Sequence, residues 1–109
     1  MTGLPGDVRR FLDRYIDSPA QLEVLLLARR SPGRNWSAED MARELYDERD
    51  AIGQCFESLL GRGLLRESPA GFFQYAPRSA RLDLAVGRLA AVYTAQRAAV
   101  LSMLGGERG

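Results

Sequence analysis

Three stretches of the sequence decide the fold: WSAEDMAREL (residues 36–45), AIGQCFESLLGRGLL (51–65) and FFQY (72–75). The first places acidic residues directly after Ser37, which is typical of a helix N-terminus. The second repeats apolar side chains at the spacing of one helix face, from Ile52 to Leu60, and then meets two glycines. This pattern predicts a helix that ends near Gly63. We therefore expect two helices separated by a few polar residues.

Beyond the glycines the apolar period changes from helical to that of strands. Residues 64–67 and 72–75 are short strand candidates, and the intervening SPAG at 68–71 is typical of a turn. A two-stranded hairpin is not stable alone, so we expect it to pack against the helices. Residues 37–76 are therefore expected to run helix, turn, helix, hairpin.

Helical patterns flank this segment on both sides. Between residues 7 and 30 we expect two helices divided at Ser18-Pro19, where serine caps the second helix and proline occupies its first turn. From 79 to 104 the helical pattern meets no breaker except Gly87, which predicts one long C-terminal helix. The sequence thus predicts a single domain over residues 1–109, mainly α with one small β-hairpin.

The composition excludes several classes of function. The 109 residues contain no His and one Cys, which excludes a His general base, a His-based triad, a His- or Cys-based metal centre and an intramolecular disulfide. Cys55 lies on an apolar helix face and is expected to be buried, not redox-active. We therefore expect no enzyme, no cofactor and no metal. The apolar runs are too short to span a bilayer, so we expect a cytoplasmic protein with no membrane partner.

Residues 36–77 resemble the winged helix-turn-helix domain of small bacterial transcriptional regulators. The resemblance is carried by the opening at 36–45, the exit LLGRGLL at 59–65 and the strand at 72–75. With its flanking helices, the whole chain is similar in layout to the MarR, PadR and ArsR types. The resemblance implies a dimeric DNA-binding regulator of transcription, whose second helix of the motif enters the major groove of double-stranded DNA while the hairpin touches the backbone.

The second helix of the motif carries side chains that suit DNA. Arg49 is able to read guanine and Gln54 adenine, although both also fit a solvated surface. Other arginines of the motif are expected to neutralise phosphates. The complete predicted DNA-binding set is Arg43, Arg49, Gln54, Ser58, Arg62 and Arg66.

The distribution of charge favours a different partner. Residues 37–76 contain four Arg and eight acids, a net charge of −4, whereas residues 1–36 carry +2 and residues 77–109 carry +3. Acids at a helix start also stabilise the helix dipole, but they repel phosphates. The alternative function is a winged helix that binds a basic protein partner through its acidic 37–76 face. A third possibility is an accessory subunit that docks onto a larger protein through its C-terminal helix.

The C-terminal pattern predicts a homodimer. Its apolar stripe is wider than one small domain needs to cover, so we expect part of it to pack on the N-terminal helix and part on a second protomer. Gln96 within the stripe either sets the register of a helix seam or is exposed. A dimer cleft with Phe11, Tyr15 and Tyr93 would suit a small apolar effector. The predicted dimer-interface residues are Leu82, Val86, Leu89, Tyr93, Gln96, Val100 and Met103.

Overall fold

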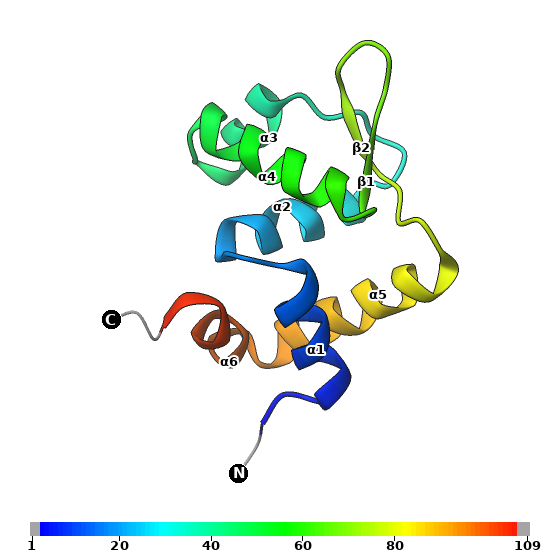
Figure 1. Ribbon diagram of the computed structural model, residues 1–109. Coiled ribbons are helices and arrows are strands. Elements are labelled where there is room, and N and C mark those ends of the chain that lie inside the picture. Colours follow the sequence, from blue (N-terminus) through cyan, green and yellow to red (C-terminus); the bar gives the residue numbers. More distant parts are fainter. Residues whose placement is uncertain (1–2, 107–109) are drawn as a thin grey trace.

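Residues 38–61 fold as two helices joined by a tight turn (Figure 1). The structure is a computed structural model that describes residues 3–106. Helix α3 (Ala38–Leu45) begins after Ser37, whose hydroxyl accepts a hydrogen bond from the backbone N–H of Asp40 at 3.0 Å. Helix α4 (Arg49–Gly61) follows after three residues. The two helices and the serine cap predicted from the sequence are confirmed.

The predicted hairpin follows α4. Gly63 turns the chain with a φ of 79°, in the left-handed region that favours glycine. Strand β1 (Leu65–Glu67) then pairs antiparallel with β2 (Phe73–Tyr75). The backbones of Trp36 and Phe73 exchange two hydrogen bonds of 2.7 and 2.8 Å, which tie the hairpin to the start of α3. The fold class, mainly α with one hairpin, is confirmed, and the layout is compatible with a winged helix.

The N-terminal segment forms the two expected helices, α1 (Gly6–Tyr15) and α2 (Pro19–Arg30). The hydroxyl of Ser18 accepts the backbone N–H of Gln21 at 3.2 Å. The Gln21 side chain in turn accepts the backbone N–H of Asp17 at 3.0 Å. This reciprocal pair satisfies N–H groups that a helix start otherwise leaves open, and it fixes the angle between α1 and α2.

The predicted single C-terminal helix over residues 79–104 is wrong. The helix breaks at Gln96, which has φ −135° and ψ 52°. A straight helix would carry its last turns past the end of the core, whereas the break returns the chain and buries Val100 completely. The C-terminal elements are α5 (Ala80–Ala95), α6 (Arg97–Leu101) and a π-helical turn (Ser102–Gly106).

Helix α2 lies between two tiers of the molecule (Figure 1). On one side it packs against α3, α4 and β2, and on the other side α1 packs against α5. One cluster of buried apolar side chains runs through both tiers and includes Trp36 and Cys55, as expected for both residues. In residues 3–106, no helix is long and apolar enough to cross a membrane.

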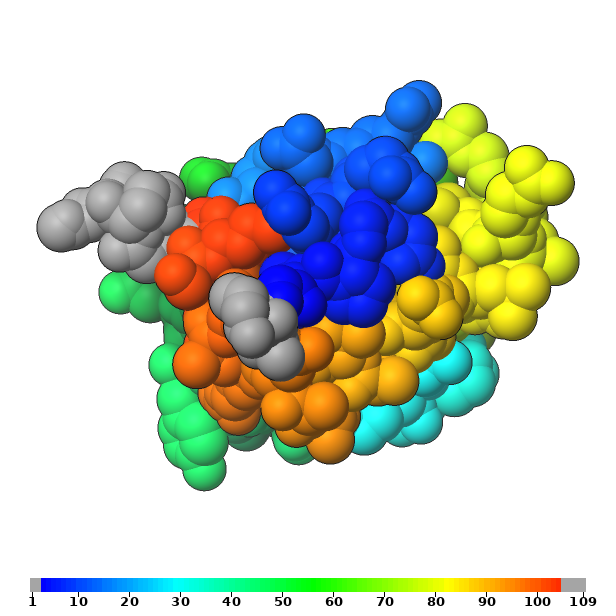
Figure 2. Space-filling model, turned by 90° about the horizontal axis from the view of Figure 1, so that it is seen from below, coloured from blue at the N-terminus to red at the C-terminus, as the bar shows by residue number. Residues whose placement is uncertain are grey.

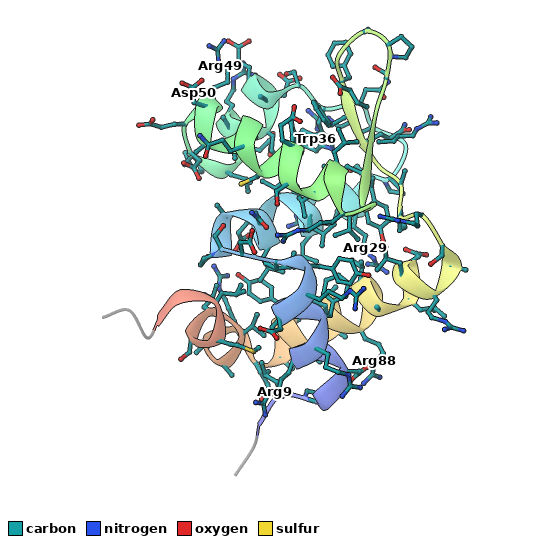
Figure 3. The ribbon with its side chains drawn as sticks, in the orientation of Figure 1. Arg9, Arg29, Trp36, Arg49, Asp50 and Arg88 are labelled. Atoms are coloured by element: carbon teal, nitrogen blue, oxygen red, sulfur yellow. The ribbon has the colours of Figure 1, made fainter. Side chains whose placement is uncertain are left out.

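Close packing against Arg29 explains why a glycine, Gly87, occurs inside α5. A Cβ atom there would lie 2.9 Å from a guanidinium nitrogen of Arg29. Arg29 reaches from α2 toward α5 in the middle of the molecule (Figure 3). Gly87 therefore makes room for a side chain that links the two tiers.

Candidate interaction surfaces

One end of the molecule carries a dense group of acidic side chains, here named the acidic face. From residue 38 to 61 there are seven acids against two arginines. Arg43 contacts Asp40 at 3.2 Å, and Arg49 lies 4.0 Å from Asp50, so each arginine stands beside an acid. Figure 3 shows Arg49 and Asp50 projecting from the outer end of α4, away from the core. The exposed carboxylates of the acidic face are Glu39, Glu44, Asp47, Glu48, Asp50 and Glu57.

The outward side of α4 is more acidic than the predicted DNA-binding set implied. Arg49 and Gln54 are exposed there, as expected, and they line a shallow groove together with Asp50 and Glu57. Ser58, which was expected on this side, is half-buried instead. Glu57 was missing from the predicted set, although it stands three residues after Gln54 and seven after Asp50. Helical periodicity counted from Asp50 would have placed it on this side.

Arg62 lies apart from the outward side of α4. Its guanidinium donates to the backbone carbonyl of Tyr15 at 2.7 Å and to the Asp17 carboxylate at 2.9 Å. The side chain is only 31% exposed. Arg62 therefore fastens the end of α4 to the connection between α1 and α2.

The hairpin brings little positive charge to the acidic face. Arg66 is exposed on β1, but its Nε donates to the side chain of Gln74 at 3.0 Å. The turn at residues 68–71 contains no basic residue, and Phe72 beside it is 39% exposed. Four of the predicted DNA-binding residues are exposed: Arg43 on α3, Arg49 and Gln54 on α4, and Arg66 on the hairpin.

Tyr46 is the most exposed large apolar side chain in the described part of the chain. It lies in the turn between α3 and α4, where 97% of it is accessible to solvent. Its backbone is left-handed, with φ 55° and ψ 48°, a conformation that costs a non-glycine residue roughly 1–2 kcal/mol. Asp47 and Glu48 follow it directly. Nothing in the sequence pattern indicated that this aromatic side chain would be exposed, because it stands within a polar interruption of the helical pattern.

The predicted dimer seam is largely occupied by the chain's own core. Leu82, Val86, Leu89 and Val100 are buried within the single chain, so they are not available to a second copy. Tyr93 is half-buried and donates its hydroxyl to Glu23 of α2, and burial together with this contact raises the pKa of Tyr93 to about 12. Gln96 is half-buried at the helix break, and Met103 is exposed. The exposed side of α5 instead presents Leu84, which is 70% accessible.

A second charged surface, here named the basic groove, lies between α1 and the first turn of α5. It encloses about 600 Å³. Figure 2 views the molecule from the side where α1 rests against α5. Phe11 and Tyr15 line the groove with their rings stacked 4.8 Å apart, whereas Tyr93 does not line it. The predicted effector cleft was to lie between two protomers, so this groove within one chain is a different site. The groove combines an apolar wall with a group of basic side chains. Its arginines are Arg10, Arg14, Arg62, Arg78 and Arg81.

An ion pair closes one end of the basic groove. Asp7 of α1 accepts two hydrogen bonds from the guanidinium of Arg88 on α5. These hydrogen bonds lower the pKa of Asp7 below its ordinary value. Asp7 is thus held as a carboxylate whose charge is already matched.

Neither the chemistry of the described residues nor comparison with known proteins assigns a reaction. Within residues 3–106, no group of three or more His, Cys, Asp and Glu side chains is placed to hold a metal ion. The chain matches no family model and no curated protein. The two charged surfaces are therefore the features of this chain that point to a function.

Proposed function

We propose that this chain is a protein-interaction module with a winged-helix layout, and that its acidic face binds a basic segment of a partner protein. The observation that carries the proposal is the outward side of α4. In a DNA-binding winged helix this side meets base edges and phosphates. Here it presents Asp50 and Glu57 on either side of Gln54.

The charge of the acidic face opposes DNA and favours a basic partner. Two unit charges about 6 Å apart interact by about 0.7 kcal/mol in bulk water, and by more where water is excluded. Double-stranded DNA carries one charge per roughly 1.7 Å of its axis, so each exposed carboxylate meets several phosphates. With seven acids and two arginines between residues 38 and 61, the repulsive contacts outnumber the attractive ones. A basic protein segment reverses the sign of every one of these terms.

Tyr46 supports a protein as the partner. Tyrosine is enriched among the residues that contribute most to protein–protein binding, because its ring supplies a large contact area and its hydroxyl a hydrogen bond. The side chain projects from the turn between the two helices that carry the acids. Its left-handed backbone is a local cost that a glycine would avoid. A binding role accounts for both the exposure and the conformation.

The proposal is tested by selecting peptides from a random twelve-residue display library on the immobilised protein at about 150 mM salt. We expect enriched peptides to contain several Arg or Lys residues beside an apolar one. Their affinity is expected to fall at least tenfold for Tyr46→Ala and for the double variant Glu48→Arg/Asp50→Arg. The matched control is Asp13→Arg/Glu67→Arg, which makes the same change of charge outside the acidic face. Peptides without a basic bias, or equal affinity for all variants, would contradict the proposal.

DNA binding is the second candidate function, because Arg49 and Gln54 are both exposed on α4. It is tested by selecting genomic fragments with the purified protein at about 50 mM salt, followed by a salt titration. Enrichment of a near-palindrome whose binding is lost in Arg49→Ala would establish DNA binding and overturn the protein-interaction proposal. The homodimer that such a site needs would have to form away from the buried residues of α5, for example around Leu84.

A further inference from the structure

The basic groove gathers arginines from three separate parts of the chain. Arg10 and Arg14 stand one helical turn apart on α1, and Arg78 and Arg81 flank the start of α5. Arg62 enters from the end of α4 and is held in place by its bonds to α1 and the following loop. Two short rows of arginines, one on α1 and one at the start of α5, therefore line one trough, and the guanidinium of Arg78 also lies against the backbone of Gly63.

The positive charge of the basic groove is not neutralised within the described residues. Residues 3–106 provide no salt-bridge partner for the four arginines of the two rows, Arg10, Arg14, Arg78 and Arg81. Asp7, the acid that lines the groove, is already paired with Arg88. Two like charges about 8 Å apart repel by about 0.5 kcal/mol in water. An anion bound in the groove would offset this repulsion between the arginines.

The first turn of α5 adds to the attraction for an anion. Ser79 caps this 16-residue helix, and Ser79, Arg81 and Leu82 all line the groove. The N-terminal end of a helix carries partial positive charge and open backbone N–H groups, which suit a phosphate. Guanidinium groups bind phosphate oxygens with two parallel hydrogen bonds. In α5 the N–H of Leu82 is already bonded to the Ser79 hydroxyl and Asp83 stands in the first turn, so the arginines supply most of the attraction for a phosphate.

One wall of the basic groove is aromatic. Tyr15 is half-exposed there, and its ring stacks on the more buried Phe11. The groove is open to solvent, so both the arginines and the exposed part of Tyr15 can be reached by a ligand. A ligand that joins several phosphates to a planar ring matches the arginine rows and the aromatic wall together.

We propose that the basic groove between α1 and α5 binds a nucleotide, with its polyphosphate between the two arginine rows and its base against Tyr15. This site is separate from the acidic face and does not depend on what that face binds. Arg10 and Arg14 hold the phosphates from α1, and Arg78 and Arg81 hold them from α5.

The test is a calorimetric titration of the whole chain with inorganic triphosphate, ATP, GTP and adenosine at about 50 mM salt. We expect triphosphate to bind, adenosine alone not to bind, and ATP or GTP to bind more tightly than triphosphate. The variant Arg14→Glu/Arg81→Glu is expected to weaken triphosphate binding at least tenfold. Residues 3–106 give these two side chains no hydrogen bond or salt bridge, so the variant is expected to fold. The control Arg30→Glu/Arg66→Glu changes the same charge outside the groove and is expected to bind as wild type.

Several outcomes would overturn the proposal. One is the absence of saturable triphosphate binding, and another is equal binding by the groove variant and the control. If neither ATP nor GTP bound more tightly than triphosphate, the nucleotide assignment would be wrong. Binding of a twelve-residue single-stranded DNA, without binding of triphosphate, would also overturn it. Tyr15→Ala is expected to abolish the difference in affinity between nucleotide and triphosphate.

Discussion

The acidic face and the basic groove lie on opposite tiers of one small protein, with α2 between them (Figure 1). In the acidic face each arginine stands beside a carboxylate, whereas in the basic groove four arginines face the trough with no acidic partner among residues 3–106. The formal net charge of +1 hides both surfaces. What each surface attracts is decided by its own local charge, and not by the net charge of the chain.

The largest expected effect comes from removing a core side chain beneath the acidic face. Phe56 of α4 is fully buried and stacks on Phe73 with ring centroids 4.5 Å apart. We expect Phe56→Ala to lower the free energy of unfolding by about 3–5 kcal/mol, measured by urea denaturation. The control is Phe72→Ala, next to Phe73 in the sequence and partly exposed, which is expected to lower the free energy of unfolding much less. If the variant still bound nucleotide after α4 had unfolded, the two tiers would fold independently of each other, and α2 would not couple them.

Arg62→Ala tests whether this arginine stabilises the fold, in contrast to an arginine on the exposed surface. Its bonds to Tyr15 and Asp17 join α4 to the loop after α1, and the side chain is about one-third exposed. After allowance for solvent screening, we expect a loss of about 1–2 kcal/mol in the free energy of unfolding. Arg66→Ala on the exposed hairpin is the matched control, with an expected change below about 0.5 kcal/mol. Equal effects of the two changes would show that Arg62 has no fastening role.

Tyr46→Gly separates stability from binding on the acidic face. Because the backbone there is left-handed, glycine is expected to raise the free energy of unfolding by about 0.5–1 kcal/mol while weakening binding of the selected peptides. Thermal unfolding and peptide titration measure the two effects. Tyr46→Asn keeps a residue type that tolerates this conformation and removes the ring. A loss of stability in both variants would mean that the tyrosine side chain supports the fold.

The smallest expected effect concerns the ion pair at the end of the basic groove. Since Arg88 lowers the pKa of Asp7, the pair stabilises the folded chain above the ordinary carboxylate pKa of about 3.9. This contribution is lost as the pH falls through the lowered pKa. The unfolding temperature of Asp7→Asn is therefore expected to lie slightly below wild type near pH 6, and the two are expected to converge below pH 3. A difference that persisted at low pH would contradict the assignment.

Much of the fold could be predicted because its signals are local. Ser18 and Ser37 each cap a helix within three residues of their own position, and Gly63 turns the chain where its conformation is needed. The break at Gln96 could not be predicted in this way, since neither proline nor glycine marks it. It is set by the burial of Val100 against the rest of the chain.

The surfaces could be predicted only in part. The acidity of residues 37–76 follows from counting charges, but the fate of Arg62 depends on partners 45 and 47 residues away. The basic groove likewise joins α1 to the start of α5, so no single helical pattern contains it. Phe11 and Tyr15 were expected in a cleft between two protomers, whereas the structure places them with several arginines in a groove of one chain, because α1 and α5 lie side by side.

The most direct test of the central claim titrates one selected basic peptide and one nucleotide, ATP or GTP, against both charge-reversal variants. We predict that Glu48→Arg/Asp50→Arg loses the peptide and keeps the nucleotide, and that Arg14→Glu/Arg81→Glu loses the nucleotide and keeps the peptide. This pattern would establish two surfaces of opposite charge with separate ligands. If either variant weakened both ligands equally, or if neither variant changed either affinity, the division into an acidic face and a basic groove with distinct partners would be contradicted.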